Sequence, residues 1–304
     1  MLACKGKQNE DAQQEDWNAV RATKAVEQMK PAIVIWTGVD PLNPLARAFE
    51  QLIDAHNDRN KERWATLEFV DSAKFAERAF AAGQAELPPD LLIVPSPLAL
   101  EMARRGLLLP VENLLERAKI DPSEIYPAAW KTLESPDGRL WGLPLCAEMK
   151  LRFVNLDRLE QGGVTTETLG SVPVERAEWA EFLASGSLQC EAASTHLKEL
   201  EEKAPGFQWR AYAMLGGKNV SSGSYVTLGL VVFKGTTKQL DSMFPLCRLS
   251  LQPGFVEALW VQGSRLPVRR PASAPELARL SPSIGSSLDE WMRSVDPAHT
   301  VGKM

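Results

Sequence analysis

The sequence predicts an α/β protein with about two lobes. Its first third alternates short apolar runs with amphipathic helical patterns, and this alternation is typical of strands that are joined by helices within one sheet. The length of 304 residues corresponds to two domains at roughly 150 residues each. Hydrophobic residues make up 44% of the chain and charged residues 24%, a composition that is ordinary for a globular protein with a buried core.

Three short apolar runs are the strand candidates of this first region. Residues 32–36 (AIVIW) are rich in β-branched side chains, residues 64–70 form a second run, and residues 90–94 (DLLIV) end at Pro95. Such runs are typical of buried parallel strands. The sequence therefore predicts an α/β domain with a largely parallel sheet.

Helical patterns lie between these runs. Apolar side chains recur at helical spacing in residues 44–58. Residues 73–82 and 98–105 are each followed by a glycine, Gly83 and Gly106, which is typical of the end of a helix. The order strand, helix, strand, helix is therefore kept through the first hundred residues.

Past residue 110 the predicted elements follow a less regular order. The helix candidates cover residues 111–120, 174–184, 194–203, 237–249, 254–261 and 286–295. The strand candidates cover residues 140–145, 150–154, 209–215 and 225–233. Turn-forming residues separate several of them, such as the Asp137-Gly138 pair and the glycine- and serine-rich stretch 216–224.

Charge and motif content exclude several function classes. The formal net charge is −5, which argues against nucleic acid as a partner because nucleic-acid-binding proteins usually carry a basic patch. No apolar stretch approaches the roughly 18 residues of a membrane span. His56, His196 and His299 are too scattered for a local metal site. Phosphate-binding loops, dinucleotide fingerprints and nucleophile motifs are missing, so we expect no enzyme, cofactor or metal.

The four cysteines leave two interpretations open. Cys4, Cys146, Cys190 and Cys247 form no C-x-x-C pair, so zinc and thioredoxin-type sites lack support. The three internal cysteines cannot all pair with one another. They are either buried reduced thiols, or Cys190 and Cys247 form one disulfide.

The amino terminus looks like the end of a bacterial lipobox. Leu2-Ala3-Cys4 matches the tail of that motif, and the polar stretch 5–16 is typical of a disordered tether. We therefore expect Cys4 to be lipidated and residues 1–28 to hold a folded body away from a membrane. The charged and apolar regions of a signal peptide do not precede Cys4. Either the sequence is cropped upstream of the lipobox, or Cys4 is an accidental cysteine near a cytoplasmic start.

An ordered series of segments carries a resemblance to a known family. Among them are DLLIVPSP at 90–97, DGRLWGLP at 137–144, LRFVNLD at 151–157 and GSRLPVR at 263–269. In order and character they resemble segments of the family 1 extracellular solute-binding proteins. These are the sugar-binding lipoproteins and periplasmic proteins of ABC importers, and they include the maltodextrin binders. The resemblance covers residues 30–160 well and 205–270 loosely.

The resemblance implies an α/β, two-lobe, periplasmic-binding-protein-like fold of class II type. Residues 29–150 with about 228–265 would form lobe 1, and residues 151–227 with about 266–304 would form lobe 2. Family members usually carry a long helical second lobe, whereas this chain soon returns to Gly216-Gly217. We therefore expect a reduced lobe 2.

The same resemblance implies a ligand site between the lobes. Sugar sites combine aromatic platforms for the ring faces with polar groups for the hydroxyls. Lobe 1 would supply Trp36, Thr37, Asp40, Ser96, Pro97 and Glu148. Lobe 2 would supply Ser224, Tyr225, Trp209 and Trp291.

Structural roles for these residues stay open beside the functional ones. Trp36 closes a buried strand and could equally lie in the core. Ser96 and Pro97 could merely turn the chain. Glu148 could form an ion pair with Lys150 or Arg152, because a buried carboxylate needs a partner.

The function that these expectations imply is an extracytoplasmic, lipid-anchored solute-binding protein. It would capture a small solute, with carbohydrate as the expected class, in an interlobe cleft and deliver it to the permease subunits of an ABC importer. By the resemblance it would be a monomer without a cofactor. The alternative is a degenerate solute-binding-like lipoprotein that acts in protein interaction or sensing without a transport ligand. An enzyme of the cell envelope has little support, because no carboxylate pair stands out.

Overall fold

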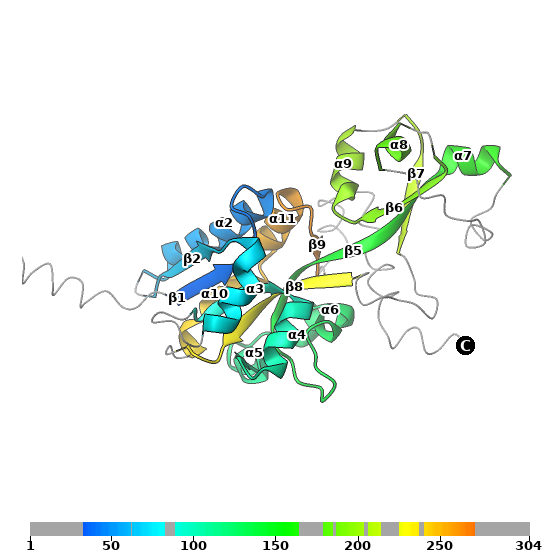
Figure 1. Cartoon of the computed structure of the whole chain (residues 1–304). Helices are drawn as coiled ribbons and strands as arrows, with labels where there is room; N and C mark the ends of the chain where they lie inside the picture. Colours follow the sequence, from blue (N-terminus) through cyan, green and yellow to red (C-terminus); the bar gives the residue numbers. More distant parts are fainter. Residues whose placement is uncertain are drawn as a thin grey trace, which may run out of the picture.

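The computed structural model describes residues 33–61, 63–82, 89–163, 179–184, 187–203, 206–213, 225–236 and 240–270. These residues form a larger first lobe and a smaller second lobe, which a long strand, β5 (Leu143–Asn155), joins (Figure 1). Cys4, the stretches 1–32 and 164–178, and the predicted helix 286–295 lie outside the described residues.

The sheet of the first lobe is mixed. Its strands are β1 (Ile33–Thr37), β2 (Ala65–Phe69), β3 (Leu91–Pro95), β8 (Tyr225–Phe233) and β5, and they stand in the order β2-β1-β3-β8-β5. β1 pairs in parallel with β2 and β3, whereas β8 runs antiparallel to both β3 and β5. The expectation of a largely parallel sheet was wrong, because β8 returns from the second lobe and enters the sheet from the opposite direction.

Two short strands complete this sheet. β4 (Leu108–Leu109) pairs with β8, and β9 (Leu266–Pro267) pairs with Cys146 and Ala147 of β5. β9 therefore belongs to the first-lobe sheet, although the sequence analysis assigned residues from about 266 onward to lobe 2. β8 likewise places residues 225–227 in the first-lobe sheet, although the sequence analysis assigned them to lobe 2. The other lobe boundaries stay predictions.

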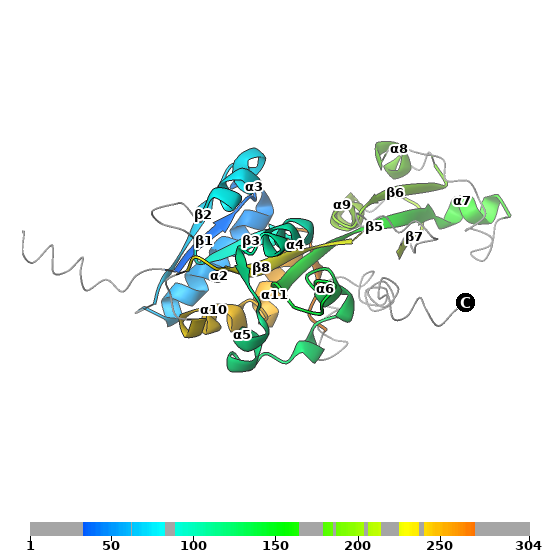
Figure 2. The ribbon, with the colours of Figure 1, turned by 60° about the horizontal axis from the view of Figure 1, so that its bottom comes forward.

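Helices cover both faces of the first-lobe sheet (Figure 2). Ile33 and Ile35 of β1 face a hydrophobic cluster shared with α2 (Pro44–Arg59), α5 (Glu112–Arg117), α6 (Pro127–Lys131), α10 (Phe244–Leu249) and α11 (Pro253–Val261). Trp36 faces the other cluster, with α3 (Ser72–Ala81) and α4 (Ser96–Arg104). The two faces follow from the period of two along a strand. Short 3-10 helices lie at Pro122–Glu124 and Leu240–Ser242.

The helix starts follow from their capping residues. Asn43 accepts a hydrogen bond from the backbone N–H of Leu45 at 2.9 Å, at the start of α2. Asp71 accepts one from the N–H of Ala73 at 2.8 Å, at the start of α3. Both side chains satisfy a donor that the first turn of a helix leaves unpaired.

The strand β5 belongs to both lobes. Its first half, from Leu143 to Met149, pairs with β8, and its second half, from Lys150 to Asn155, pairs with β6 (Gln189–Ala193) and β7 (Trp209–Ala213). The sequence analysis predicted two strands here. The residues between them, from Cys146 to Met149, continue the strand because β8 and β9 bond to its two edges.

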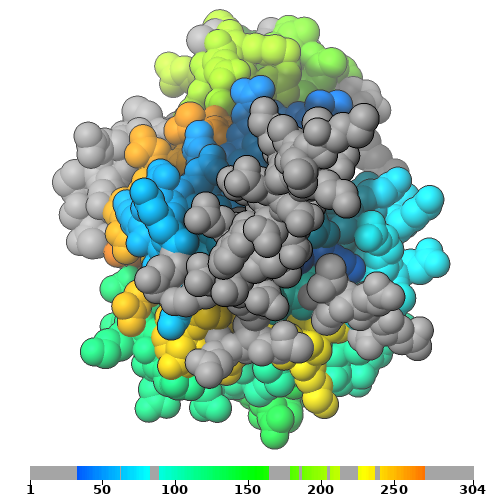
Figure 3. Space-filling model, turned by 90° about the vertical axis from the view of Figure 1, so that its left-hand side faces the viewer, coloured from blue at the N-terminus to red at the C-terminus, as the bar shows by residue number. Residues whose placement is uncertain are grey.

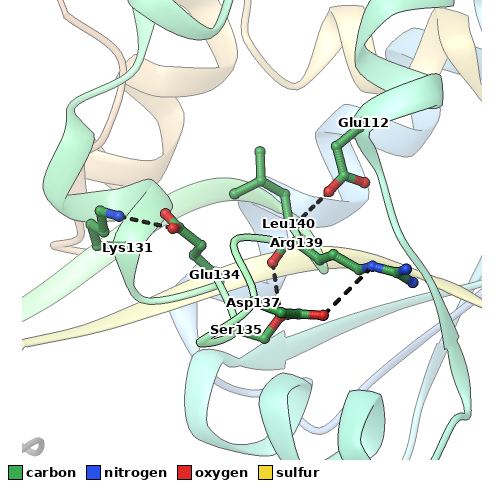
Figure 4. A network of polar contacts seen from close by, with 7 residues as sticks. All are labelled: Glu112, Lys131, Glu134, Ser135, Asp137, Arg139 and Leu140. Atoms are coloured by element: carbon green, nitrogen blue, oxygen red, sulfur yellow. Dashed lines mark hydrogen bonds and ion pairs between the residues drawn. The ribbon is translucent and has the colours of Figure 1, made fainter.

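The hairpin before β5 is held by a polar network (Figure 4). The hydroxyl of Ser135 donates to Asp137 at 2.5 Å, and Glu112 accepts from the backbone N–H of Leu140 at 2.8 Å. Gly138 has a φ of 82°, a left-handed conformation that favours glycine. The DGRLWGLP segment therefore works as a fixed turn that leads into β5.

The second lobe packs α8 (Trp179–Leu183) against β6, and buried leucines of α9 (His196–Lys203) join the same hydrophobic cluster, with α7 (Leu156–Gln161) directly after β5. Phe153 of β5 is its central side chain, and its ring centroid lies 5.1 Å from Trp179, 6.3 Å from Phe182 and 6.4 Å from Trp209. β6 was not predicted from the sequence.

The internal cysteines are buried and are not joined by disulfides. Cys146 lies on β5, Cys190 on β6 of the second lobe and Cys247 on α10 of the first lobe. The interpretation as reduced thiols is confirmed, and the Cys190–Cys247 disulfide was wrong because the two residues belong to different lobes. Burial raises the pKa of both Cys146 and Cys247 to about 12. Among the described residues, no helix is both long and apolar enough to cross a bilayer.

We expect a Phe153→Ala variant to destabilise the second lobe strongly. Phe153 is fully buried, and truncating such a residue to alanine costs about 3–5 kcal/mol of unfolding free energy. Urea denaturation followed by tryptophan fluorescence measures the change. Leu42→Ala is the control, because Leu42 is 91% exposed and its truncation should change the free energy by less than about 0.5 kcal/mol. Equal effects of the two substitutions would contradict this packing.

We expect the internal thiols to resist a thiol reagent in the folded protein. In a Cys4→Ser variant at mildly alkaline pH, Cys146, Cys190 and Cys247 should stay unmodified until denaturant is added, because they are buried. Mass spectrometry after labelling counts the modified thiols in each state. Labelling of only one cysteine in the unfolded, unreduced chain would reveal a disulfide and overturn this result.

Candidate functional site

One edge of the first-lobe sheet faces the second lobe. β1 and β3 run in the same direction as β5, whose outer half lies in the second lobe, so the carboxyl ends of β1 and β3 point that way (Figure 1). The register places Pro95 of β3 opposite Leu228, and Leu228 opposite Cys146 of β5. Ligands of α/β proteins commonly bind outside the carboxyl ends of such strands.

Thr37 and Asp40 stand at the end of β1. Thr37 is fully buried, and its hydroxyl oxygen accepts a hydrogen bond from the N–H of Val39 at 3.3 Å. Asp40 is exposed, and its carboxylate accepts from the N–H of Leu42 at 2.8 Å. Asp40 therefore presents a carboxylate at this edge, while Thr37 supports the loop.

Trp36 lies in the core cluster beneath α3 and α4. It is 5% exposed, and the guanidinium of Arg78 lies 5.2 Å from its ring centroid. Trp36 therefore lies in the core, as the alternative interpretation of the sequence allowed. Its role as a stacking platform stays a prediction.

Ser96 and Pro97 begin α4, directly after β3. Ser96 is buried, and its hydroxyl oxygen lies 3.4 Å from the backbone nitrogen of Thr227, which donates to it. Pro97 is exposed. Ser96 thus links the end of β3 to the start of β8.

Glu148 forms an ion pair with Arg265. The alternative partners that the sequence suggested, Lys150 and Arg152, were wrong. Both pair with Glu191 of β6, at 3.7 Å and 3.3 Å. The reason is the register: Glu191 lies opposite Arg152, whereas β9 holds the turn that carries Arg265 beside the inner half of β5.

Arg265 is a residue that sequence reasoning missed. It lies inside the GSRLPVR segment that contributed to the resemblance, but its contact with Glu148 depends on a strand pair between residues far apart in the chain. The turn that carries it is tightly built. The N–H groups of Gly263 and Arg265 both donate to the carbonyl of Leu259 at 3.1 Å, and Ser264 has a φ of 51°.

Tyr225 begins β8 and lies opposite Met149 of β5. It therefore stands in the first-lobe sheet, next to the strand of Glu148, and not in the second lobe. Burial raises the pKa of the Tyr225 hydroxyl, and a hydrogen bond with Thr227 acts in the opposite direction. The structure thus brings Tyr225, Ser96 and Glu148 to neighbouring strands of one edge.

The remaining predicted residues do not join this edge among the described parts of the chain. Trp209 pairs with Asn155, seven residues beyond Glu148 on β5, which is a separation of roughly 23 Å at about 3.3 Å per residue. It packs against Phe153 in the second-lobe core. Ser224, Trp291 and the predicted lipidation site Cys4 lie outside the described residues.

A contact between α9 and α11 joins the two lobes. The ammonium of Lys198 on α9 donates to the backbone carbonyl of Val261, the last residue of α11. Carbonyls at a helix end lack intrahelical partners, and cations near that end interact favourably with the helix dipole. Lys198 therefore connects the second lobe to the first from outside the sheet.

The position of α9 is held by Glu199. This carboxylate accepts from the indole N–H of Trp179 at 2.8 Å, pairs with Lys203 at 2.7 Å and lies 3.2 Å from the ring nitrogen of His196. The hydrogen bond from Lys203 is the main cause that lowers the pKa of Glu199 to about 2, and Trp179 and His196 add to it. Glu199 thereby ties α9 to α8.

A pocket in the first lobe lies elsewhere. Its volume is ≈ 390 Å³, and it lies between α2 and the segment from α10 to α11, where Figure 3 shows α2 in blue against α11 in orange. None of the predicted ligand residues lines it. No group of metal-ligating side chains is present in the parts of the chain that the structure describes.

Comparisons with solved structures identify proteins with a similar fold. No family model matches the sequence, and no curated protein matches it. Among solved structures, the sugar-binding protein MalE from Xanthomonas citri is similar with a TM-score of 0.67 and 18% identity, over 89% of this chain and 91% of that chain.

Two further structures are similar at lower sequence identity. A sugar transporter from Rhizobium etli in an open conformation has a TM-score of 0.65 at 13% identity, over 88% of both chains. UgpB from Mycobacterium tuberculosis in complex with glycerophosphocholine has a TM-score of 0.62 at 15% identity, over 86% of both chains.

At these identities the likeness establishes the fold, and it confirms the predicted fold class. The chain has the two-lobe α/β fold of the family 1 extracellular solute-binding proteins.

Proposed function

We propose that this protein captures a small solute, a carbohydrate, between its two lobes outside the cytoplasm and delivers it to an ABC importer. The observation that carries the proposal is the polar edge of the first-lobe sheet, where Ser96, Tyr225 and Glu148 stand at neighbouring strands and Asp40 follows β1, in a fold shared with sugar-binding proteins. The role is binding, without covalent chemistry or a cofactor.

The residues at this edge suit sugar hydroxyls. Carboxylates such as Asp40 and Glu148 accept hydrogen bonds from hydroxyl groups, and charge-assisted hydrogen bonds are stronger than neutral ones. Thr37 and Ser96 hold the ends of β1 and β3 in place. Trp36, Pro97, Ser224 and Trp291 complete the proposed ligand set, with the tryptophans as platforms for ring faces, whereas Trp209 packs in the second-lobe core.

The mechanism would be hinge closure around the solute. The lobes are joined by β5 and by the contact between Lys198 and Val261. Bending between the inner and outer halves of β5 would move the second lobe against the edge that holds Glu148. The closed form would then be recognised by the permease subunits of the importer.

The remaining parts of the proposal concern location and assembly. Lipidation of Cys4 would anchor the protein to the membrane, and the polar stretch that follows would act as the tether. The protein would work as a monomer at the cell surface or in the periplasm.

We expect a carbohydrate to raise the thermal stability of this protein, and Glu148→Ala to weaken that effect. A ligand at a hundred times its Kd adds about 2.7 kcal/mol of stability, which shifts the melting temperature by several degrees. Thermal unfolding against mono- and oligosaccharides, polyols and amino acids measures the shift.

Glu50→Ala is the control for this experiment, because Glu50 is exposed on α2 away from the edge. It should respond to the same solute as the unsubstituted protein. A panel without any shift would contradict the proposal and favour a lipoprotein that binds another protein. An unchanged response of Glu148→Ala would overturn the site while leaving the function standing.

We expect Lys198→Met to loosen the arrangement of the lobes. The substitution keeps the apolar stem of the side chain and removes the donor to the Val261 carbonyl. Spin labels at two exposed positions, Arg47 on α2 and Glu181 on α8, report the distance between the lobes. The distance distribution should broaden.

Lys203→Met is the matched control for the same helix. Lys203 pairs with Glu199 inside the second lobe, so its loss should leave the interlobe distance unchanged. Identical distributions for the two variants would show that Lys198 does not connect the lobes.

A further inference from the structure

The ion pair between Glu148 and Arg265 lies at the edge proposed to bind the solute, and both side chains are only partly open to solvent. The side chain of Arg265 is 21% exposed and that of Glu148 is 39% exposed. Charges at such a site are less screened than charges on the surface. A solute that enters here therefore meets two charges that are already paired with each other.

The backbone holds Arg265 in this position. Its own N–H donates to Leu259, and the next two residues form β9, with Leu266 opposite Ala147 and Pro267 opposite Cys146. Gly263 permits the turn, because a Cβ there would stand 2.5 Å from Leu45 and 2.9 Å from the Leu259 carbonyl. Arg265 is thus placed by the fold and not by a flexible surface loop.

Other cations do not compensate Glu148 among the described residues. Lys150 and Arg152, on the same strand, are engaged with Glu191. Arg265 therefore decides the net charge that the inner half of β5 presents to a solute. The charges of Glu148 and Arg265 together sum to zero. Without Arg265, this edge would carry the unpaired and partly exposed carboxylate of Glu148.

This balance has a consequence for selectivity. A neutral polyol can donate to the carboxylate of Glu148 and accept from the guanidinium of Arg265, so both charges gain a partner. A cationic solute would be repelled by the guanidinium of Arg265, and an anionic solute would be repelled by the carboxylate of Glu148. Like-charge contacts of this kind reject the wrong partner.

We propose that Arg265 is a specificity-determining residue that makes the cleft select solutes without net charge. The inference rests on the proposed function and names its solute class more narrowly. Glu148 and Arg265 form one recognition unit, and removal of either member changes the charge that the site prefers.

The test combines charge variants with matched sugars. The variants are Arg265→Gln, Glu148→Gln and the double variant, and the probes at equal concentration are glucose, glucosamine and glucuronate, with the corresponding galactose series. Arg269→Gln is the control, since Arg269 lies in the same segment and pairs with Glu124 at 3.3 Å. Calorimetry gives the affinity ratios, and thermal unfolding of the four proteins without ligand gives a double-mutant cycle.

The unsubstituted protein and the Arg269→Gln control should prefer the neutral member of a series. Arg265→Gln should shift the ratio toward the amino sugar by about tenfold or more, and Glu148→Gln should shift it toward the uronate by a similar factor. The double variant should return to the neutral preference. In the cycle, the two single substitutions should lower the melting temperature non-additively.

The contrary outcomes can be told apart. An additive cycle would show that the pair does not form, which overturns the inference. A coupled cycle with an unchanged order of affinities in Arg265→Gln would overturn the inference and leave the proposed function intact. A coupled cycle with no binding of any probe by any variant would contradict the proposed function for these sugars, and the inference would fall with it.

Discussion

The structure depends on one continuous strand that serves two sheets. β5 bonds to β8 and β9 in its inner half and to β6 and β7 in its outer half, so the hydrogen bonds of both lobes meet on a single backbone. Because side chains alternate along a strand, a shift of one residue would exchange the buried and exposed faces of a lobe. The alternation along β5 therefore also determines which way Glu148 and Phe153 point.

The edge that we assign to the solute follows from this strand and from β8. β8 starts at the second-lobe side and runs back between β3 and β5, which brings Tyr225 and Thr227 level with Ser96 and Glu148. β9 bonds to the other edge of β5 and holds Arg265 beside it. Strand pairing thus determines where these side chains lie, and Glu148 and Arg265 are the charged groups that it brings to this edge.

Local signals in the sequence were sufficient for the first three strands and helices. β1, β3 and α2 lie within two residues of their predicted bounds, because apolar runs, capping residues and helix-ending glycines all act locally. The direction of β8, the unity of β5 and the strand β6 were not predicted, because they depend on pairing between distant segments. For the same reason Glu148 was found as a candidate, while its partner Arg265 was not.

The route of the chain also says how such a protein can change over evolution. The chain leaves the first-lobe sheet along β5 and re-enters it along β8, and these two strands are direct neighbours. The described part of the second lobe is therefore an insertion whose ends lie side by side, a position where segments can be gained or lost with little effect on the rest of a domain. The second-lobe side of the proposed cleft can therefore change in size during evolution, while the first-lobe side, which holds Glu148 and Arg265, stays the same.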